Sequence, residues 1–316
     1  MTAAQNNTKG ILFILIGMIV FSIQDALIKF IYEDTALYEL YLGRTLSAAF
    51  FLFCYMKFTK QKVNFKTHYP LLTTIRIICF FFGFSFFYIS LTYMSLAMAN
   101  ALFFSSPFFV SILAVIFLNE KVGIRRWLAI SAGFIGVFIV LNPDFNEFDY
   151  KKLAPIACAL CYSISMTITK YTSDKDNSYT QMMHLYFGAT IISILFFIFT
   201  GDGQFNTSSD PTFQFIFREW FINPTYAWPI IILMGFIGAL AFFCVFNAYS
   251  IASPSVVSLY EYSLIIWSII IGYILFDNIP TIRTFVGVSI IIGAGIYIYL
   301  REKVKDQMIV TDTPNR

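Results

Sequence analysis

The stretch that decides the fold is AMANALFFSSPFFVSILAVIFL, which covers residues 97–118 and contains no Asp, Glu, Lys or Arg. A helix rises about 1.5 Å per residue, so a helix of this length crosses the roughly 30 Å hydrocarbon core of a bilayer. A second apolar run, 124–141, begins after a short loop. We therefore expect two consecutive membrane spans.

Eight more segments on either side of this pair have the length and apolar character of membrane spans. The composition agrees, because 58% of the residues are hydrophobic and only 12% are charged. A soluble domain carries about 25% charged residues, so the surplus apolar surface of this chain is expected to face lipid. We predict an all-α membrane protein with ten spans. The expected spans are 11–31, 36–57, 70–92, 97–118, 124–141, 150–171, 179–199, 228–250, 254–276 and 281–300.

The lysines and arginines predict the orientation. They gather in segments 57–66, 121–126 and 301–305, which ten spans place on one side of the membrane. Positive charge marks the cytoplasmic side, so we expect both termini in the cytoplasm and the chain in the inner (plasma) membrane. The net charge of +3 is too small to indicate a nucleic-acid partner.

The two halves of the chain repeat each other. At a shift of 158 residues, the third to fifth spans overlay the eighth to tenth without a gap, and Ser105 falls on Ser263. At a shift of 141, residues 21–30 overlay 162–171, so that Phe21 falls on Tyr162. Five spans is an odd number, so the second copy must enter the membrane from the opposite side. This predicts an inverted repeat, an arrangement frequent in secondary transporters. The expected units are a first repeat at 1–147, a second repeat at 148–305 and a cytoplasmic tail at 306–316.

Residues 76–143 carry a set of motifs in a fixed order. A Phe-rich third span is followed by SPF (106–108), FLNEKVG (117–123), RRW (125–127) and GFIGV (133–137). This order resembles the EamA family of the drug/metabolite transporter superfamily, whose commonest signature is Leu-x-Glu after a Pro-containing fourth span. In the second copy, Asp277-Asn278 stands in place of Leu-x-Glu, and Ile265 in place of Pro107.

The resemblance sets the functional expectation. The form VGIRRW (122–127) is similar to a bacterial subgroup that includes S-adenosylmethionine and riboflavin importers. It implies ten helices, a central cavity and secondary transport of a small organic metabolite such as S-adenosylmethionine, riboflavin or an amino-acid-like compound. Export by the same fold is the alternative, and an intramembrane enzyme is a more distant one, since the chain has neither HExxH nor GxSxG. No GxxxxGK[ST] loop is present for ATP binding.

Charged residues inside the spans are the first site candidates, because an ionisable group at mid-membrane costs ~2.5–3.5 kcal/mol and must face protein or water. Asp25 in the first span and Arg44 in the second lie at similar depths in the outer half, with Gln24 beside Asp25. We hypothesise that Asp25 and Arg44 form an ion pair or share a substrate. The alternative is a purely structural pair.

Two further charged residues lie nearer the cytoplasmic side. Arg76 in the third span and Glu261 in the ninth have matching depths, so they are expected to pair or to line one inner vestibule. Tyr260 and Tyr262 flank Glu261 and could stack on a flat ligand or hydrogen-bond to it. A shielded carboxylate of this kind could also carry a proton. For Arg76 the alternative is a place beside lipid phosphate.

Two other side chains complete the expected cavity. Tyr88 in the third span is a cavity candidate, and His184 in the seventh has packing as its alternative role. The five cysteines lie in apolar segments and are interpreted as packing residues, so no metal or other cofactor is expected. The sequence leaves open whether two copies of the chain form a homodimer. The expected cavity residues are Gln24, Asp25, Arg44, Arg76, Tyr88, His184, Tyr260, Glu261 and Tyr262.

Overall fold

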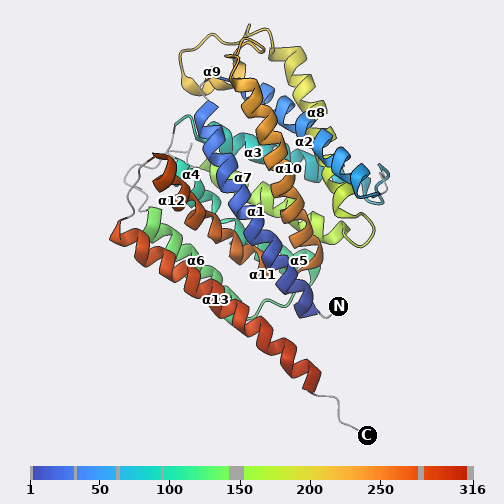
Figure 1. The fold of residues 1–316 in the computed structure, drawn as a ribbon, viewed down its shortest axis with the longest axis vertical. Helices are drawn as coiled ribbons and strands as arrows, with labels where there is room; N and C mark the ends of the chain where they lie inside the picture. The colour runs from blue at the N-terminus through green and yellow to red at the C-terminus, as the bar shows by residue number, and fades with distance from the viewer. Residues whose placement is uncertain are drawn as a thin grey trace.

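The computed structural model describes residues 3–31, 34–61, 65–93, 96–141, 153–276 and 281–311, and within these ranges the regular structure is entirely helical. The first half contains α1 (Ala3–Ile31), α2 (Leu37–Phe58), α3 (Pro70–Ser90), α4 (Leu96–Phe103), α5 (Ser106–Leu118) and α6 (Ile124–Leu141). The second half contains α7 (Leu153–Thr172), α8 (Ser178–Thr200), α9 (Pro211–Phe217), α10 (Ala227–Ile251), α11 (Pro254–Val257), the 3-10 turn η2 (Ser258–Tyr262), α12 (Ser263–Phe276) and α13 (Ile282–Thr311). The start of α1 and the end of α13 lie toward the same end of the bundle (Figure 1).

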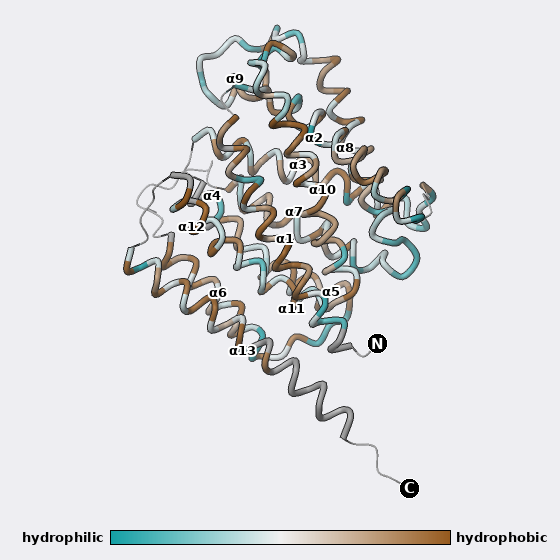
Figure 2. Tube along the Cα trace, in the orientation of Figure 1, coloured by the Kyte–Doolittle hydropathy of each residue, from teal (hydrophilic) through white to brown (hydrophobic). Residues whose placement is uncertain are grey.

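The surface of the bundle is apolar along its length. Large hydrophobic side chains are exposed on many helices, including Phe50, Ile116 and Ile198. Figure 2 shows the hydrophobic colour along the long helices and much of the hydrophilic colour in the segments that connect them. Such an exterior is stable only in lipid, so the protein is a multi-pass membrane protein. Six helical segments of the described chain are long and apolar enough to cross a membrane: Asn6–Ile28, Pro70–Ser90, Leu153–Thr172, Ser178–Thr200, Ala227–Ile251 and Pro254–Ile271.

Two of the expected spans are not regular α-helices throughout. The span expected at 97–118 breaks between α4 and α5, where Pro107 lies in the first turn of α5. Proline has no backbone N–H, so the helical bond to the preceding turn is lost. The span expected at 254–276 stays helical, but it changes from the 3-10 turn η2 to the α-helix α12, and the residue at the equivalent of Pro107 is Ile265; we call both irregularities breaks. Here the backbone tightens into a 3-10 turn without a proline, and the two breaks coincide in the register that overlays Ser105 on Ser263.

The helix contacts are reciprocal. The long contact of α1 with α10 has a counterpart in the contact of α7 with α3. In the same way, α12 packs against α1 as α5 packs against α7. Two further large contacts, α2 with α8 and α6 with α13, each join a helix to its own counterpart in the other half. In addition, α2 packs against α10 as α8 packs, less extensively, against α3.

Glycines on α10 bring α1 and α2 close to it. A Cβ atom at Gly235 would lie 1.8 Å from the hydroxyl of Ser47 on α2, and one at Gly238 would lie 2.9 Å from the amide oxygen of Gln24 on α1. Small residues of this kind allow helix backbones to approach closely in membranes. The close packing brings Gln24 of α1 and Arg44 of α2 against neighbouring turns of α10, since a Cβ at Gly235 would also lie 2.7 Å from the Arg44 carbonyl oxygen.

Candidate functional site

A buried carboxylate lies where the two broken helices meet. Glu261, in η2, is only 2% exposed. Its Oε1 accepts hydrogen bonds from the hydroxyls of Tyr162 on α7 and Tyr249 on α10, each 2.6 Å long. Its Oε2 accepts a longer one, 3.5 Å, from Ser106, the first residue of α5. Residues of both halves therefore surround one carboxylate, and among the described residues no cation pairs with it. Such a group can bind and release a proton.

The tyrosines on either side of Glu261 form hydrogen bonds to neighbouring helices and not to the carboxylate. The hydroxyl of Tyr260 donates to the carbonyl of Gly295 on α13 at 2.9 Å, and that of Tyr262 donates to the carbonyl of Ile130 on α6 at 3.3 Å. Both side chains are buried. Their role in stacking on a ligand stays a prediction.

The sequence reading missed the two tyrosines that do contact Glu261. Tyr162 and Tyr249 lie on different helices, so no spacing along the chain connects them to Glu261. The repeat alignment contained one signal, because it places the polar Tyr162 over Phe21 of the first copy. A tyrosine in one copy aligned with a phenylalanine in the other indicates a position where the two copies differ in hydrogen-bonding chemistry.

Arg76 is fully buried and incompletely satisfied. Its Nη1 donates to the amide oxygen of Gln181 at 2.5 Å and to the hydroxyl of Thr172 at 3.4 Å. Its guanidinium carbon lies 5.9 Å from the centre of the Phe246 ring, and its Nε and Nη2 have no partner in the described part of the chain. The hypothesis that Arg76 pairs with Glu261 is wrong, since each has its own partners. A joint vestibule stays a prediction.

Asp25 and Arg44 are brought together without contact. The Nη1 of Arg44, which is 3% exposed, donates to the hydroxyl of Tyr88. Gln24, the neighbour of Asp25, and the backbone of Arg44 both lie against α10, at Gly238 and Gly235, yet Asp25 and Arg44 do not form one of the ion pairs of the described residues. The ion-pair form of the hypothesis is therefore wrong, and a shared substrate stays a prediction. Gln24, next to Asp25, is 1% exposed.

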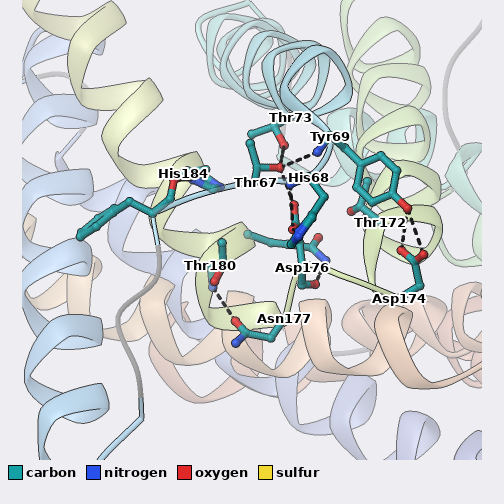
Figure 3. A network of polar contacts seen from close by, with 12 residues as sticks. Thr67, His68, Tyr69, Thr73, Thr172, Asp174, Asp176, Asn177, Thr180 and His184 are labelled. Atoms are coloured by element: carbon teal, nitrogen blue, oxygen red, sulfur yellow. Dashed lines mark hydrogen bonds and ion pairs between the residues drawn. The ribbon is translucent and has the colours of Figure 1, made fainter.

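A polar network lies at the end of the bundle where α7 turns into α8, and Figure 3 shows its side chains. Asp176, in the turn between α7 and α8, accepts hydrogen bonds from the Thr67 hydroxyl and from the backbone N–H of His68 at 3.2 Å. Its Oδ1 also lies 3.0 Å from Nδ1 of the His68 ring. Burial by itself raises the pKa of Asp176, but these hydrogen bonds outweigh it and hold the pKa below its usual value. The network ties the α7–α8 turn to the segment before α3.

His184 belongs to this end and not to the neighbourhood of Glu261. Its Nε2 lies 2.8 Å from the carbonyl oxygen of Phe65, in the segment before α3 (Figure 3). The network also reaches Arg76, because the amide nitrogen of Gln181 donates to the carbonyl of Asp176 at 2.8 Å. A role for His184 in the cavity stays a prediction.

Glu120, the acid of the Leu-x-Glu motif, makes a second connection. It accepts from Arg126 at 3.1 Å, from Ser255 at 2.5 Å and from Ser253. It thereby joins the end of α5 to the start of α11. Elsewhere, Glu39 at the start of α2 accepts from the side chain of Asn223 at 2.6 Å, so carboxylates also link α2 to the segment before α10.

The EamA-like transporter family model matches residues 8–142 and, a second time, residues 152–301. The chain belongs to the EamA-like transporter family. The resemblance seen in the sequence is confirmed, and because this is a family of transporters, the protein is a transporter and not an enzyme.

Several relatives of this EamA protein have names. It is 25% identical over 301 residues to the S-adenosylmethionine uptake transporter of Rickettsia prowazekii, which covers 95% of this chain and 96% of the relative. It is 28% identical over 192 residues to the riboflavin transporter of Vibrio cholerae, covering 61% and 58%. It is 18% identical over 294 residues to a pseudopaline exporter of Pseudomonas aeruginosa, covering 91% and 95%.

The fold also matches a solved structure. A crystal structure with 14% sequence identity superposes with a TM-score of 0.73 and covers 93% of this chain and 98% of the other. At that identity the match supports the fold alone.

Proposed function

We propose that this EamA protein is a secondary transporter that moves a small organic metabolite across the inner (plasma) membrane by alternating access. The observation that carries the proposal is the Glu261 cluster. A carboxylate buried inside a membrane bundle is costly, and where it is found it marks a path for a substrate or a proton. Here residues of both halves, Ser106 and Tyr162 among them, contact that carboxylate.

The proposed architecture is ten spans in two inverted repeats, 1–147 and 148–305, followed by a cytoplasmic tail at 306–316. Three observations support it: the family model matches twice, the helix contacts are reciprocal, and the two breaks coincide in the repeat register. Interrupted helices at corresponding positions of two halves are typical of transporter binding sites. The distribution of lysine and arginine supports cytoplasmic termini.

In the proposed cycle, the two ends of the bundle open in turn. Opening the end at Asp176 separates the α7–α8 turn from Thr67 and His68. Opening the other end separates the start of α2 from the segment before α10, and so Glu39 from Asn223. Each opening breaks a few hydrogen bonds to carboxylates, which are modest in free energy, about 1.5–3 kcal/mol each. Two states of similar stability follow, as alternating access requires.

Glu261 is proposed to couple this cycle to a proton. In one state its carboxylate accepts from Tyr162 and Tyr249, and in the other it takes a proton from the side that has opened. Substrate exchange and movement down the substrate gradient are the alternative sources of energy. The candidate substrates are S-adenosylmethionine, riboflavin and amino-acid-like compounds.

The test is uptake by the purified protein in liposomes. We expect saturable uptake and counterflow of radiolabelled S-adenosylmethionine or riboflavin. The Glu261→Gln variant should keep counterflow but lose accumulation driven by an imposed pH gradient. The matched control is Glu219→Gln, which changes an exposed acid outside the bundle. Absence of counterflow with every candidate contradicts transport of these substrates, and an unchanged pH response of Glu261→Gln contradicts proton coupling through this residue.

Export is a second candidate, and the likeness to the pseudopaline exporter over 91% of the chain favours it. Sided liposomes distinguish the two directions. With the pH gradient imposed in each orientation, an importer accumulates substrate from the outer face and an exporter from the cytoplasmic face.

A further inference from the structure

Arg44 has hydrogen-bonding capacity that the protein does not use. Its Nη1 donates to Tyr88, and its guanidinium carbon lies 5.5 Å from the Tyr41 ring centre and 5.7 Å from that of Tyr88. Within the described ranges it has no carboxylate partner. A buried guanidinium normally has its charge compensated, because an isolated charge in low dielectric is costly.

The hydroxyl of Tyr186, on α8, is a second unused group. The side chain is 3% exposed, and its hydroxyl has no hydrogen-bond partner among the described residues. Thr190, one turn further along α8, forms a 3.0 Å hydrogen bond with Thr45, the residue after Arg44, so α8 and α2 meet at this level. A buried hydroxyl left without a partner costs about 1–3 kcal/mol, so it is retained where a ligand or water completes it.

Asp25 supplies the opposite charge from α1. Its side chain is half-buried and makes no hydrogen bond or ion pair to the described parts of the chain. The amide oxygen of the neighbouring Gln24 is buried and also has no partner there. A carboxylate and an amide oxygen side by side accept hydrogen bonds from an ammonium group.

Gln24 and Arg44 lie against neighbouring turns of α10, because Cβ atoms at Gly238 and Gly235 would lie 2.9 Å from the Gln24 amide oxygen and 2.7 Å from the Arg44 carbonyl oxygen. Asp25, next to Gln24, nevertheless does not form an ion pair with Arg44. We propose that they form a binding site for the zwitterionic head of an amino-acid-like metabolite. The carboxylate of the ligand binds Arg44 and the Tyr186 hydroxyl, and its ammonium binds Asp25 and the Gln24 amide oxygen. Guanidinium groups bind carboxylates in two parallel hydrogen bonds, which fixes the orientation of the ligand.

The site gives the proposed transporter a substrate class, and in this it rests on the proposed function. Recognition depends on the charged head and not on the rest of the ligand. S-adenosylmethionine carries such a head. Riboflavin has neither an ammonium nor a carboxylate group, so it would leave both charges of the site uncompensated.

Binding to the purified full-length protein tests the proposal. The probes are S-adenosylmethionine, its decarboxylated form and riboflavin, together with the common L-amino acids. We expect the wild-type protein to bind S-adenosylmethionine more tightly than the decarboxylated form by about 10- to 100-fold, the value of a charge-assisted hydrogen-bonded pair. If neither S-adenosylmethionine nor any of the amino acids binds, the proposal is overturned.

Arg44→Gln and Asp25→Asn test separately the recognition of the ligand carboxylate and of the ligand ammonium group. Arg44→Gln should remove the preference for S-adenosylmethionine over its decarboxylated form, because that preference comes from the carboxylate. Asp25→Asn should weaken both ligands, since both keep the ammonium group. The control is Lys57→Gln, which removes an exposed cation from the same helix as Arg44. An equal loss for both ligands in Arg44→Gln contradicts the assignment.

Tyr186→Phe keeps the test decisive if the charge variants fold poorly. The hydroxyl has no partner in the protein, so its removal should leave the melting temperature unchanged or slightly raised. Binding of S-adenosylmethionine should nevertheless weaken about 3- to 10-fold, the effect of one lost hydrogen bond. Unchanged binding in this variant contradicts a role for the hydroxyl in the site.

Parallel assays keep the two proposals distinct. Binding of zwitterions without counterflow in liposomes would contradict transport but support the site. Counterflow of riboflavin with no binding of any zwitterion would support transport and overturn the site.

Discussion

The two helix breaks occupy the same position in the repeat but differ in chemistry. In the first copy the residue at the break is Phe103, and in the second copy it is Glu261. The ring of Phe103 lies 5.5 Å from that of Tyr162, whereas Glu261 accepts a hydrogen bond from the same tyrosine. Both copies thus have a helix break at this position, but only the second copy has an ionisable side chain there.

This difference separates scaffold from function. A break exposes backbone groups and places side chains between the halves whatever the residue types are. The chemistry depends on single positions that diverged, such as Tyr162 opposite Phe21 in the repeat alignment. Four predictions test the contrast, beginning with the largest expected effect.

Glu261→Leu should destabilise the protein most. The variant leaves the buried hydroxyls of Tyr162 and Tyr249 without an acceptor, at an expected cost of about 3 kcal/mol. Its counterpart Phe103→Leu changes only packing and should cost about 1 kcal/mol. Equilibrium unfolding in mixed micelles measures both. Glu261→Gln, which keeps an acceptor oxygen, should retain most of the stability, and equal losses at positions 103 and 261 would remove the contrast.

Gly133→Ala should disturb the second break from outside. A Cβ at Gly133 would lie 2.5 Å from the ring of Tyr262, which is buried and hydrogen-bonded to Ile130. Such overpacking costs about 2 kcal/mol. The matched control is Gly293→Ala on α13, where a Cβ would meet nothing within 4 Å. This change should be neutral or stabilising by up to about 1 kcal/mol, as alanine favours helix. Thermal unfolding that ranks the two variants in the opposite order would contradict the packing described here.

Asp176→Asn tests whether a carboxylate between the halves matters away from the breaks. Asp176 is hydrogen-bonded by Thr67 and His68, and its pKa is held below the usual value. Its contribution is therefore present above the ordinary pKa of aspartate and is lost as the pH falls through the lower folded-state value. We expect a loss of about 1 kcal/mol from pH 5 to 8 that shrinks below about pH 4.

The control for this measurement is Asp174→Asn. Asp174 accepts from the hydroxyl of Tyr69 at the exposed surface, and its removal should leave the unfolding curve unchanged. A difference between wild type and Asp176→Asn that grows as the pH falls would contradict the stated sign.

Pro107→Ile should have the smallest effect. The second copy carries Ile265 at this position and is broken nonetheless. Proline therefore strengthens the first break without being its sole cause, and we expect a change within about 0.5 kcal/mol and uptake within about twofold of wild type. A large gain in stability together with lost uptake would show that proline alone holds the first break open.

Much of the fold was predictable because membrane spans are long and uniformly apolar. Helices cover most of each of the ten expected ranges in the described chain. The resemblance to the EamA family came from motifs around Glu120, and the family model confirms it. The second break was not predictable, since Ile265 gives no local signal. The partners of charged residues were not predictable either: equal depth suggested an Arg76–Glu261 pair, but depth does not specify which faces of two helices meet.

The sequence by itself determined that the chain is an all-helical membrane protein of the EamA family, because hydropathy and motif order are local properties that need no knowledge of packing. Tertiary structure alone decided that Tyr162, Tyr249 and Ser106 surround Glu261, and that Arg44 and Asp25 are near without pairing. The physical reason is that hydrogen bonds and charge pairs form over about 3–4 Å. Only the packed arrangement of α5, α7, α10 and η2 brings groups far apart in the chain within that distance.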